Sequence, residues 1–439
     1  MQPKKTENNS LPFSTLIENQ INMNHPLVIL SKEISWDVFE DAFNKLYSTK
    51  MGRPGKSIRL MVSLLLLKHI RNLSDESVVE QWIENMYYQY FGGQQFFTTK
   101  APCESSELVH FRNRIGAEGM ELILKESIRI NGKDGDGNVL SADTTVQEKN
   151  ISYPTDDKLH KKIVKKCIKI AEETGMELRQ SYKTTLKKLS VIQRFRKSKK
   201  HYKIALKADK KIKTIAGRLV RELERKLNPS EYAKYSDSIE IFNKILKQKR
   251  HESNKIYSIH EPQVECHSKG KEHKKFEFGN KVSVLVNQKT GVIVGAISIE
   301  QNKHDSKTIV DATEQYFRLN PQGKAKEIYV DRGYRGVTKV EEIKIKVAGK
   351  EKNITTSQKR KHSRRAAIEP KIGHLKSDHR LSRNFYKGVI GDQINILLAA
   401  AAMNFKRMMN KWKSFFCQFL TMLSELIAFQ DRGLCLKST

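Results

Sequence analysis

The sequence predicts an α/β protein: a mixed sheet with flanking helices, preceded by an all-α N-terminal domain and interrupted in the chain by a basic helical insertion. Three observations predict it. Apolar residues recur at helical spacing in the N-terminal part, short β-type runs follow, and a lysine-rich stretch of helical periodicity separates the first of these runs from the others. We expect a helical domain over 1–135, sheet residues over 136–157 and 256–412, the insertion over 158–255 and a C-terminal tail over 413–439.

In the N-terminal region, serines mark the starts of three expected helices. Ser35 precedes 36–46, whose aromatic residues share one face, and Ser57 precedes the largely apolar 58–70. Ser74 can accept a backbone hydrogen bond at the start of the next helix. Short helices with tight connections predict a compact helical domain.

The expected strands are short apolar runs. The first is 139–146, and the next two, 281–287 and 292–299, flank a short turn that contains glycine, which predicts a hairpin. Two further strands are expected at 327–331 and 343–347. The helical insertion therefore interrupts the sheet in sequence, and we expect the strands to meet in space.

The chain is strongly basic. It has 81 Lys and Arg against 49 Asp and Glu, a formal charge of +32 and a pI near 9.8. Residues 158–255 alone have 30 Lys and Arg against 10 Asp and Glu, which is +20 of that charge. Such an excess is typical of proteins that neutralise phosphates, so we expect a nucleic acid as partner, with the N-terminal domain docking on DNA.

Other classes are disfavoured by composition. The five cysteines include no C-x-x-C pair, which argues against a disulfide scaffold and favours a reducing compartment. No run approaches the roughly 18 uncharged apolar residues of a membrane span, and the N-terminus does not resemble a secretory signal. We therefore expect no membrane association.

Three acidic residues stand where chemistry is expected. Asp143 lies at the end of the first strand, and Asp331 ends the strand over 327–331. Carboxylates at strand ends commonly project into a site at one edge of a sheet. Glu369 lies inside a strongly basic run. A fourth acid, Asp305, follows His304 and is interpreted as a helix cap rather than a metal ligand.

Basic residues surround Glu369 at helical spacing. Arg365 lies four positions before it and Lys376 seven after it, so on one helix they would share a stripe with His362. Three carboxylates among many cations suit two-metal phosphoryl transfer, in which oxygen ligands hold Mg²⁺ or Mn²⁺ and cations hold phosphates. Any one of these acids alone would more simply be an ordinary surface carboxylate.

These motifs together resemble the DDE transposases of bacterial insertion sequences, in the insertion-sequence-5 group, whose catalytic domain is ribonuclease-H-like. The resemblance extends from about Asp37 to Asn404. It is carried by Gly52-Arg53-Pro54, Leu73-Ser74-Asp75-Glu76, Tyr87-Tyr88-Gln89-Tyr90-Phe91-Gly92-Gly93, Asp143-Thr144-Thr145-Val146, Tyr153-Pro154-Thr155-Asp156, Asp331-Arg332-Gly333-Tyr334, and a Y-x2-R-x3-E-x6-K signature with Arg365, Glu369 and Lys376 in register.

The resemblance implies a catalytic and metal-binding triad of Asp143, Asp331 and Glu369. It implies two divalent ions, Mg²⁺ or Mn²⁺, and a double-stranded DNA partner in the form of terminal inverted repeats and target. A homodimer in the active complex and a bacterial cytoplasmic, nucleoid-associated location are also implied. The expected DNA-binding residues are Arg365, Lys376, His362 and Arg332.

Two departures from the signature affect this interpretation. His362 stands where the family has tyrosine, and Pro370, which has no backbone N–H, follows Glu369 directly. Either the helix is bent at Pro370, or it starts near Ala366 and leaves His362 and Arg365 in the entering loop, which would weaken the case for a single stripe.

The expected function is that of a transposase that binds the terminal inverted repeats of its own element and catalyses metal-dependent cleavage and strand transfer. Two alternatives remain open at this point. One is a catalytically inactive or repurposed relative that only binds DNA; the other is a related metal nuclease without strand transfer.

Overall fold

The structure is a computed structural model that describes residues 15–48, 52–249, 251–268, 275–301, 303–349 and 354–435. The chain divides into two compact units. One comprises Met1–Gln147 with Lys281–Thr439, and the other is Glu148–Asn280. The second unit is wider than the expected insertion over 158–255.

The N-terminal region is helical, as predicted. Ser74 caps its helix, because its hydroxyl accepts the Ser77 N–H at 3.0 Å. Ser35 and Ser57 stand at the N-cap positions of their helices but make no side-chain capping bond. The elements are η1 (Ile17–Asn19), α1 (Pro26–Glu33), α2 (Trp36–Asn44), α3 (Ile58–Ile70), α4 (Asp75–Glu84), α5 (Met86–Phe91), α6 (Ser105–Asn131) and η2 (Gly132–Asp134).

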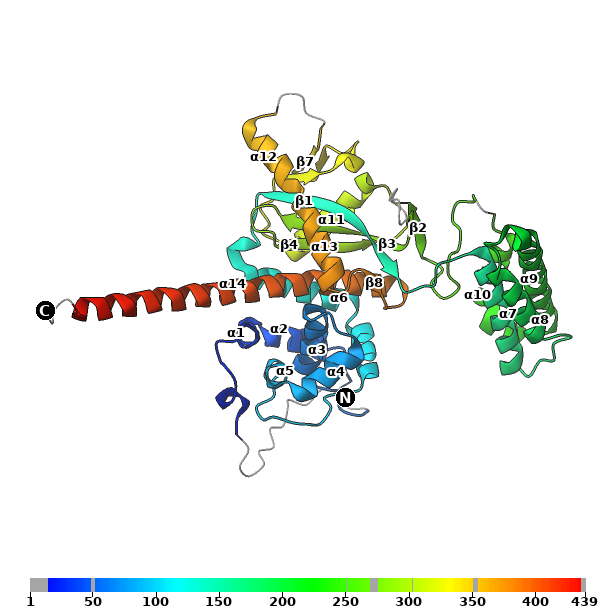
Figure 1. Ribbon diagram of the computed structural model, residues 1–439, viewed down its shortest axis with the longest axis horizontal. Coiled ribbons are helices and arrows are strands. Elements are labelled where there is room, and N and C mark those ends of the chain that lie inside the picture. The colour runs from blue at the N-terminus through cyan, green and yellow to red at the C-terminus, as the bar shows by residue number, and fades with distance from the viewer. Residues whose placement is uncertain are drawn as a thin grey trace. The chain divides into compact units, whose positions relative to one another are not determined.

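These helices do not form a separate domain, which corrects the expected boundary near residue 135. The long helix α14 (Gly388–Cys435) packs against both α6 and α3 and also against the sheet, so that one apolar core continues from the N-terminal helices into the sheet (Figure 1). The fully buried alanines 399–402 allow this close packing, because small side chains let helices approach.

α14 also replaces the expected tail over 413–439, since the helix continues without a break to Cys435. Its segment Gly388–Phe415 is long and apolar enough to cross a membrane, but 72% of the most apolar stretch is buried inside the protein. The segment is therefore a core helix by its packing.

The sheet is mixed and, in the described part of the chain, has eight strands, which confirms the predicted fold class. Its order is β2-β3-β1-β5-β7-β6, with β4 paired to β3 and β8 to β1. The strands β1, β5 and β7 are parallel, whereas β3 and β4 form the predicted antiparallel hairpin. Their bounds are β1 (Val139–Lys149), β2 (Glu265–Ser268), β3 (Phe276–Asn287), β4 (Ile293–Ile299), β5 (Glu327–Val330), β6 (Lys339–Val340), β7 (Ile343–Val347) and β8 (Arg383–Asn384).

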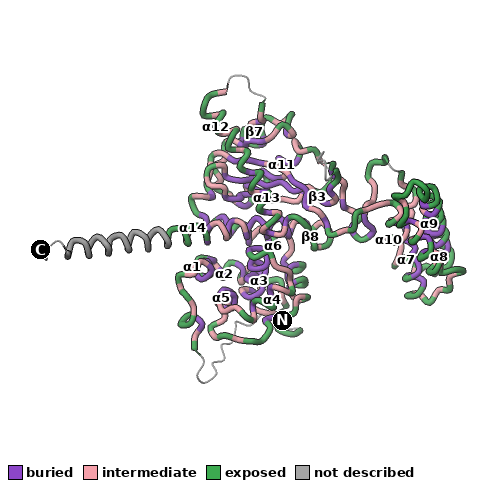
Figure 2. Tube along the Cα trace, in the orientation of Figure 1, coloured by how far each residue is buried: buried purple, intermediate pink, exposed green. Residues whose placement is uncertain are grey.

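Helices cover the sheet, and the strands are largely buried beneath them (Figure 2). On one side α11 (Asp305–Leu319) packs in a core with Leu140 and Ala142 of β1 and with Ile328 and Val330 of β5. The helices α12 (Thr356–Arg365) and α13 (Ile368–Asp378) run across the strands in orange in Figure 1.

Within its described residues, the second unit contains four helices, in agreement with the helical insertion that the sequence indicated. The apolar residues at helical spacing that predicted helices, such as Ile212, Ile215, Leu219 and Leu223, form its core. A capping box between Asn228 and Glu231 starts the last helix. The helices are α7 (Asp156–Glu173), α8 (Lys183–Arg194), α9 (Lys199–Lys226) and α10 (Pro229–Lys247).

Candidate active site

The parallel pairing of β1 with β5 brings two of the three candidate carboxylates together. Leu140 pairs with Ile328 and Ser141 with Tyr329. Continued by two positions, this register sets Asp143 opposite Asp331, on strands that lie about 4.8 Å apart. Two residues distant in sequence are thus neighbours on adjacent strands. Asp331 directly follows the end of β5, as expected, whereas Asp143 lies inside β1, which continues to Lys149 and is longer than the sequence indicated.

Both carboxylates belong to the sheet face that α12 covers. Side chains alternate between the faces of a strand, and Ala142 and Val330 point into the core with α11. Asp143 and Asp331 therefore point to the opposite face. Tyr329, two residues before Asp331, lies on that face too, since its ring contacts His362 of α12 at a centroid distance of 4.7 Å.

Three contacts hold α12 in place over β5 and β1. Lys361 Nζ lies 2.6 Å from Glu327 Oε2, and the His362 ring packs edge-on against Tyr329. The Gln288 side-chain amide donates both to the Lys361 carbonyl, at 2.7 Å, and to Ser141 Oγ, at 3.2 Å. The histidine that replaces the signature tyrosine thus packs against the sheet.

The basic run is divided between two helices, so the single stripe expected from its spacing is wrong. α12 ends at Arg365 and α13 begins at Ile368, with Pro370 in the first turn, where a missing N–H costs no helical hydrogen bond. His362 and Arg365 nevertheless lie in a helix rather than a loop. Across the break, Arg365 Nη2 is 3.6 Å from Glu369 Oε1.

The electrostatic state of Asp143 shows that the third acid is also near. The pKa of Asp143 is raised to about 6, chiefly by burial and also by the negative charges of Asp331 and Glu369. The Thr144 N–H, which donates to Asp143 Oδ1 at 2.8 Å, and the positive charge of Arg365 act in the opposite direction. All three candidate carboxylates and Arg365 therefore share one electrostatic environment.

A fourth carboxylate, Asp305, borders this site, and sequence reasoning assigned it wrongly. The cap of α11 is His304, which accepts from the Ser306 N–H, so Asp305 is the first helical residue instead of the cap. Asp305 Oδ1 accepts from Thr144 Oγ1 at 3.0 Å and from Lys281 Nζ at 2.9 Å. Its partners come from β1 and β3, and no local sequence signal announces them.

Gly333 shows how closely Asp305 approaches Asp331. A Cβ atom at Gly333 would lie 3.0 Å from Asp305 Oδ2 and 3.1 Å from Asp331 Oδ1. The Gly333 N–H donates to Asp331 Oδ1 at 2.9 Å and fixes this carboxylate as the cap of a short 3-10 helix, η3 (Arg332–Tyr334). A larger residue at this position would press on both carboxylate groups, which glycine avoids.

Tyr334 lies in the core beneath these carboxylates. It is fully buried. Burial and the charges of Asp143, Asp305 and Asp331 raise its pKa far above the usual value, which keeps the phenol neutral. Three aspartates therefore surround one buried hydroxyl.

The remaining candidates, Arg332 and Lys376, lie further out. Arg332 is exposed and its guanidinium passes over Gly349, where a Cβ would meet it at 3.3 Å. Lys376 is in the last turn of α13, about 10 Å along the helix from Glu369. Neither is among the residues that the strand register and the charges around Asp143 bring together.

The donor chemistry suits a hard divalent cation, although no group of three or more His, Cys, Asp or Glu in the described part of the chain is arranged to hold a metal ion. Asp143 and Asp331 fit such an ion, because their register brings two carboxylates together and the raised pKa of Asp143 marks an excess of negative charge. The Glu369 side chain is 63% exposed and lies beside Arg365, so it must turn to join them.

Comparison with known families agrees with this arrangement. Residues 15–114 match a family described as "Transposase domain (DUF772)", and residues 254–405 match the "Transposase DDE domain". The second match contains Asp331 and Glu369, whereas the strand with Asp143 precedes it.

A curated relative, "Uncharacterized protein ORF8 in nfe locus" from Rhizobium meliloti, is 40% identical over 184 residues, which is 41% of this chain and 88% of the relative. No solved structure matches. The helical N-terminal match, the mixed sheet and the DDE-domain match lead to one conclusion: this chain belongs to the DDE transposase family, metal-dependent phosphoryl-transfer enzymes that act on DNA.

Proposed function

We propose that this protein is an active transposase of the insertion-sequence-5 group, which binds the terminal inverted repeats of its own element, cleaves them and joins them to target DNA. The observation that carries the proposal is the β1–β5 register, which sets Asp143 beside Asp331 while the charge of Glu369 acts on the same carboxyl. These three side chains would hold two Mg²⁺ or Mn²⁺ ions. An active complex of two copies, one for each end, and a nucleoid-associated location in the bacterial cytoplasm complete the proposal.

The chain's own residues prepare the site for this chemistry. When bound, a divalent cation supplies a nucleophile at neutral pH and neutralises charge on the scissile phosphate. The N–H groups of Thr144 and Gly333 each hold one carboxylate oxygen, of Asp143 and Asp331 respectively, in a fixed position. Arg365 provides a positive charge beside the carboxylates, suited to a DNA phosphate.

A nicking assay tests the proposal. The substrate is DNA that carries the genomic ends flanking the gene, with and without Mg²⁺, and the products are strands cut at the termini and joined strands. We expect Asp143→Asn, Asp331→Asn and Glu369→Gln each to reduce nicking by roughly a thousandfold or more while DNA binding survives. Glu314→Gln, on the exposed side of α11, is the matched control and should cut normally.

The outcomes separate the rival functions. Variants of the three acids that still cut would refute the triad assignment. Wild-type protein that binds the ends but never nicks them would support the inactive DNA-binding alternative, which the exposed position of Glu369 beside Arg365 also favours. Nicking without joined products would indicate a nuclease without strand transfer.

A further inference from the structure

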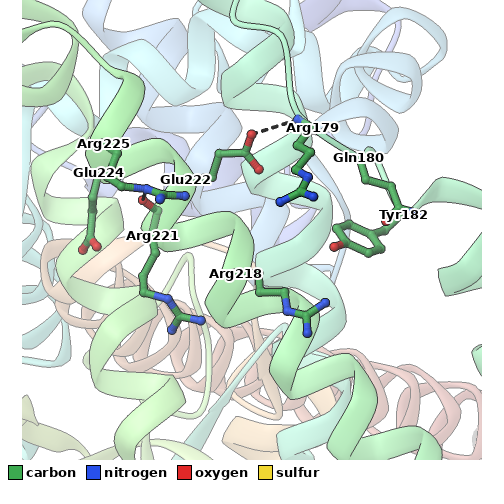
Figure 3. A pocket seen from close by; sticks show the side chains of 8 residues that line it. All are labelled: Arg179, Gln180, Tyr182, Arg218, Arg221, Glu222, Glu224 and Arg225. Atoms are coloured by element: carbon green, nitrogen blue, oxygen red, sulfur yellow. Dashed lines mark hydrogen bonds between the residues drawn. The ribbon is translucent and has the colours of Figure 1, made fainter.

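The helical unit Glu148–Asn280 contains a cavity of about 790 Å³ between α9 and the segment that connects α7 to α8 (Figure 3). Four of its eight lining residues are arginines, and we call it the arginine pocket. Its lining is Arg179, Gln180, Tyr182, Arg218, Arg221, Glu222, Glu224 and Arg225.

The choice of arginine is specific to this place. Residues 158–255 have 23 lysines and only 7 arginines, yet four of those arginines line the pocket and no lysine does. Arginine presents a planar fork of donors that binds a phosphate with two parallel hydrogen bonds, whereas lysine acts as a point charge. A merely solvated basic surface would show the lysine-rich composition of the rest of the unit.

The arginines come from facing elements. Arg218, Arg221 and Arg225 are spaced by three and four positions on α9, so they lie on one side of that helix. Arg179 belongs to the connecting segment, and Figure 3 shows its guanidinium group and the Tyr182 ring on the side of the pocket opposite α9. Like charges thus converge on one cavity.

The acidic residues of the lining are engaged elsewhere. The Glu222 carboxylate is buried and accepts from the Arg179 backbone N–H at 2.8 Å and from Lys226 Nζ at 2.9 Å. Glu224 accepts from Asn243 Nδ2 at 2.7 Å. Among the described residues, none of the four guanidinium groups forms an ion pair, although the charge of Arg225 acts on Glu222. Four arginines against two glutamates leave the lining with an excess of positive charge.

The hydrogen bonds to Glu222 also build the wall of the pocket. They tie the connecting segment to α9, and Lys226 Nζ reinforces the link by donating to the Glu177 carbonyl at 2.7 Å. Tyr182 packs against the apolar core of the unit, which holds this end of the segment. The arginines therefore face a cavity that exists before any ligand enters.

We propose that the arginine pocket binds backbone phosphates of duplex DNA. The inference rests on the proposed function, which supplies DNA as the polyanion, and adds the place where the basic helical unit holds it. The excess of positive charge, the arginine forks and the preformed wall all suit a phosphate group. The fork also pairs with carboxylates, and phosphate is the anion that the DNA of the proposed function supplies.

The test compares two triple variants of α9 that remove the same charge. One is Arg218→Ala with Arg221→Ala and Arg225→Ala. The control is Lys203→Ala with Lys207→Ala and Lys210→Ala, which are exposed on the same helix outside the pocket. Dissociation constants are measured by fluorescence anisotropy, without divalent cations, on a duplex with the flanking genomic ends and on a scrambled duplex of equal length.

We expect the pocket variant to bind both duplexes at least about tenfold more weakly than the control variant, with a log–log salt slope reduced by about one for each phosphate that is no longer neutralised. Equal weakening in the two variants, or none in the pocket variant, would overturn the proposal. A third variant with lysine at the three positions keeps the charge and the helix; it should bind more weakly than wild type because the fork is absent, and binding at the wild-type level would overturn the proposal even if the alanine variant fails to fold.

Failure of this proposal can be told apart from failure of the proposed function. The binding assay contains no divalent cation and needs no cleavage. If the protein nicks the ends and its pocket variant binds DNA as well as the control variant, only the proposal for the arginine pocket is refuted. If DNA binding depends on the arginine pocket but the protein never nicks the ends, only the proposed transposase activity is refuted.

Discussion

Two carboxylates of the same compact unit, Asp75 in the N-terminal helices and Asp143 within β1, have opposite surroundings. Asp75 accepts from Arg112 with both oxygens, at 2.6 and 2.9 Å, and lies 2.8 Å from Lys68 Nζ. Burial alone would raise the pKa of Asp75, but these two cations outweigh it and the pKa is lowered. Asp143 is also buried, its charged neighbours are two acids and one arginine, and its pKa is raised to about 6.

The negative charge of Asp75 therefore stabilises the fold, whereas that of Asp143 destabilises it. Asp75 joins α4 to α3 and α6, and its two cations stack on the Tyr386 ring at 4.7 and 4.4 Å, so the negative charge of Asp75 is balanced by cations inside the protein. Burial and the neighbouring negative charges disfavour the ionised form of Asp143. A bound cation would stabilise that ionised form. The lowered pKa of Asp75 thus indicates a structural role, and the raised pKa of Asp143 indicates a role in the site.

The largest expected effect is at the balanced cluster. Asp75→Ala leaves Arg112 and Lys68 buried without their counter-charge, and it should lower the free energy of unfolding by about 3–5 kcal/mol in urea titrations. Glu80→Ala, exposed on the same helix, is the control and should change it little. A loss at Asp75 no larger than at Glu80 would contradict the structural role of the cluster.

The second largest effect is expected at Asp143, where substitution should increase stability rather than decrease it. The pKa of Asp143 is about 6 in the folded protein against an ordinary value of 3.8, so folding favours its protonated form. Ionised Asp143 therefore destabilises the fold fully above about pH 6, less as the pH falls, and not at all well below pH 4. Without divalent cations, Asp143→Asn should be more stable than wild type at pH 8 by on the order of 2 kcal/mol, and most of this advantage should be lost at pH 4.

A divalent cation should reverse that order. Addition of Mn²⁺ should raise the melting temperature of wild-type protein, since a ligand that binds only the folded state stabilises it, and should have little effect on the Asn variant. Equal shifts in both proteins would show that the cation binds elsewhere.

The smallest expected effect concerns Lys281, which pairs with Asp305 at the border of the site. Lys281 neutralises Asp305, which the geometry at Gly333 places against Asp331. Lys281→Met should release Asp305 toward Asp331 and slow nicking about tenfold, equivalent to about 1.4 kcal/mol, with DNA affinity unchanged. Lys307→Met, an exposed lysine two residues after Asp305, is the matched control. Equal nicking rates in the two variants would remove Lys281 from the positioning network.

Local patterns predicted the elements but not their partners. The hairpin of β3 and β4 and the start of α4 at Ser74 follow from short-range signals and are confirmed. The break between α12 and α13 was only half anticipated: Pro370 signalled a change, yet the helix ends before it, because proline is favourable in a first turn. The N-terminal helices looked independent in sequence, and α14, from the far end of the chain, merges their core with the sheet.

By itself, the sequence determined the kinds of chemistry available: carboxylates on or directly after strands, a lysine-rich basic insertion, and the motifs of the family. Tertiary structure decided which of these groups are neighbours. The register of β1 and β5, the ion pair of Lys281 with Asp305 and the meeting of Arg179 with the α9 arginines all join residues distant in the chain. Such contacts depend on how the elements pack around a shared core, which no local window of sequence encodes.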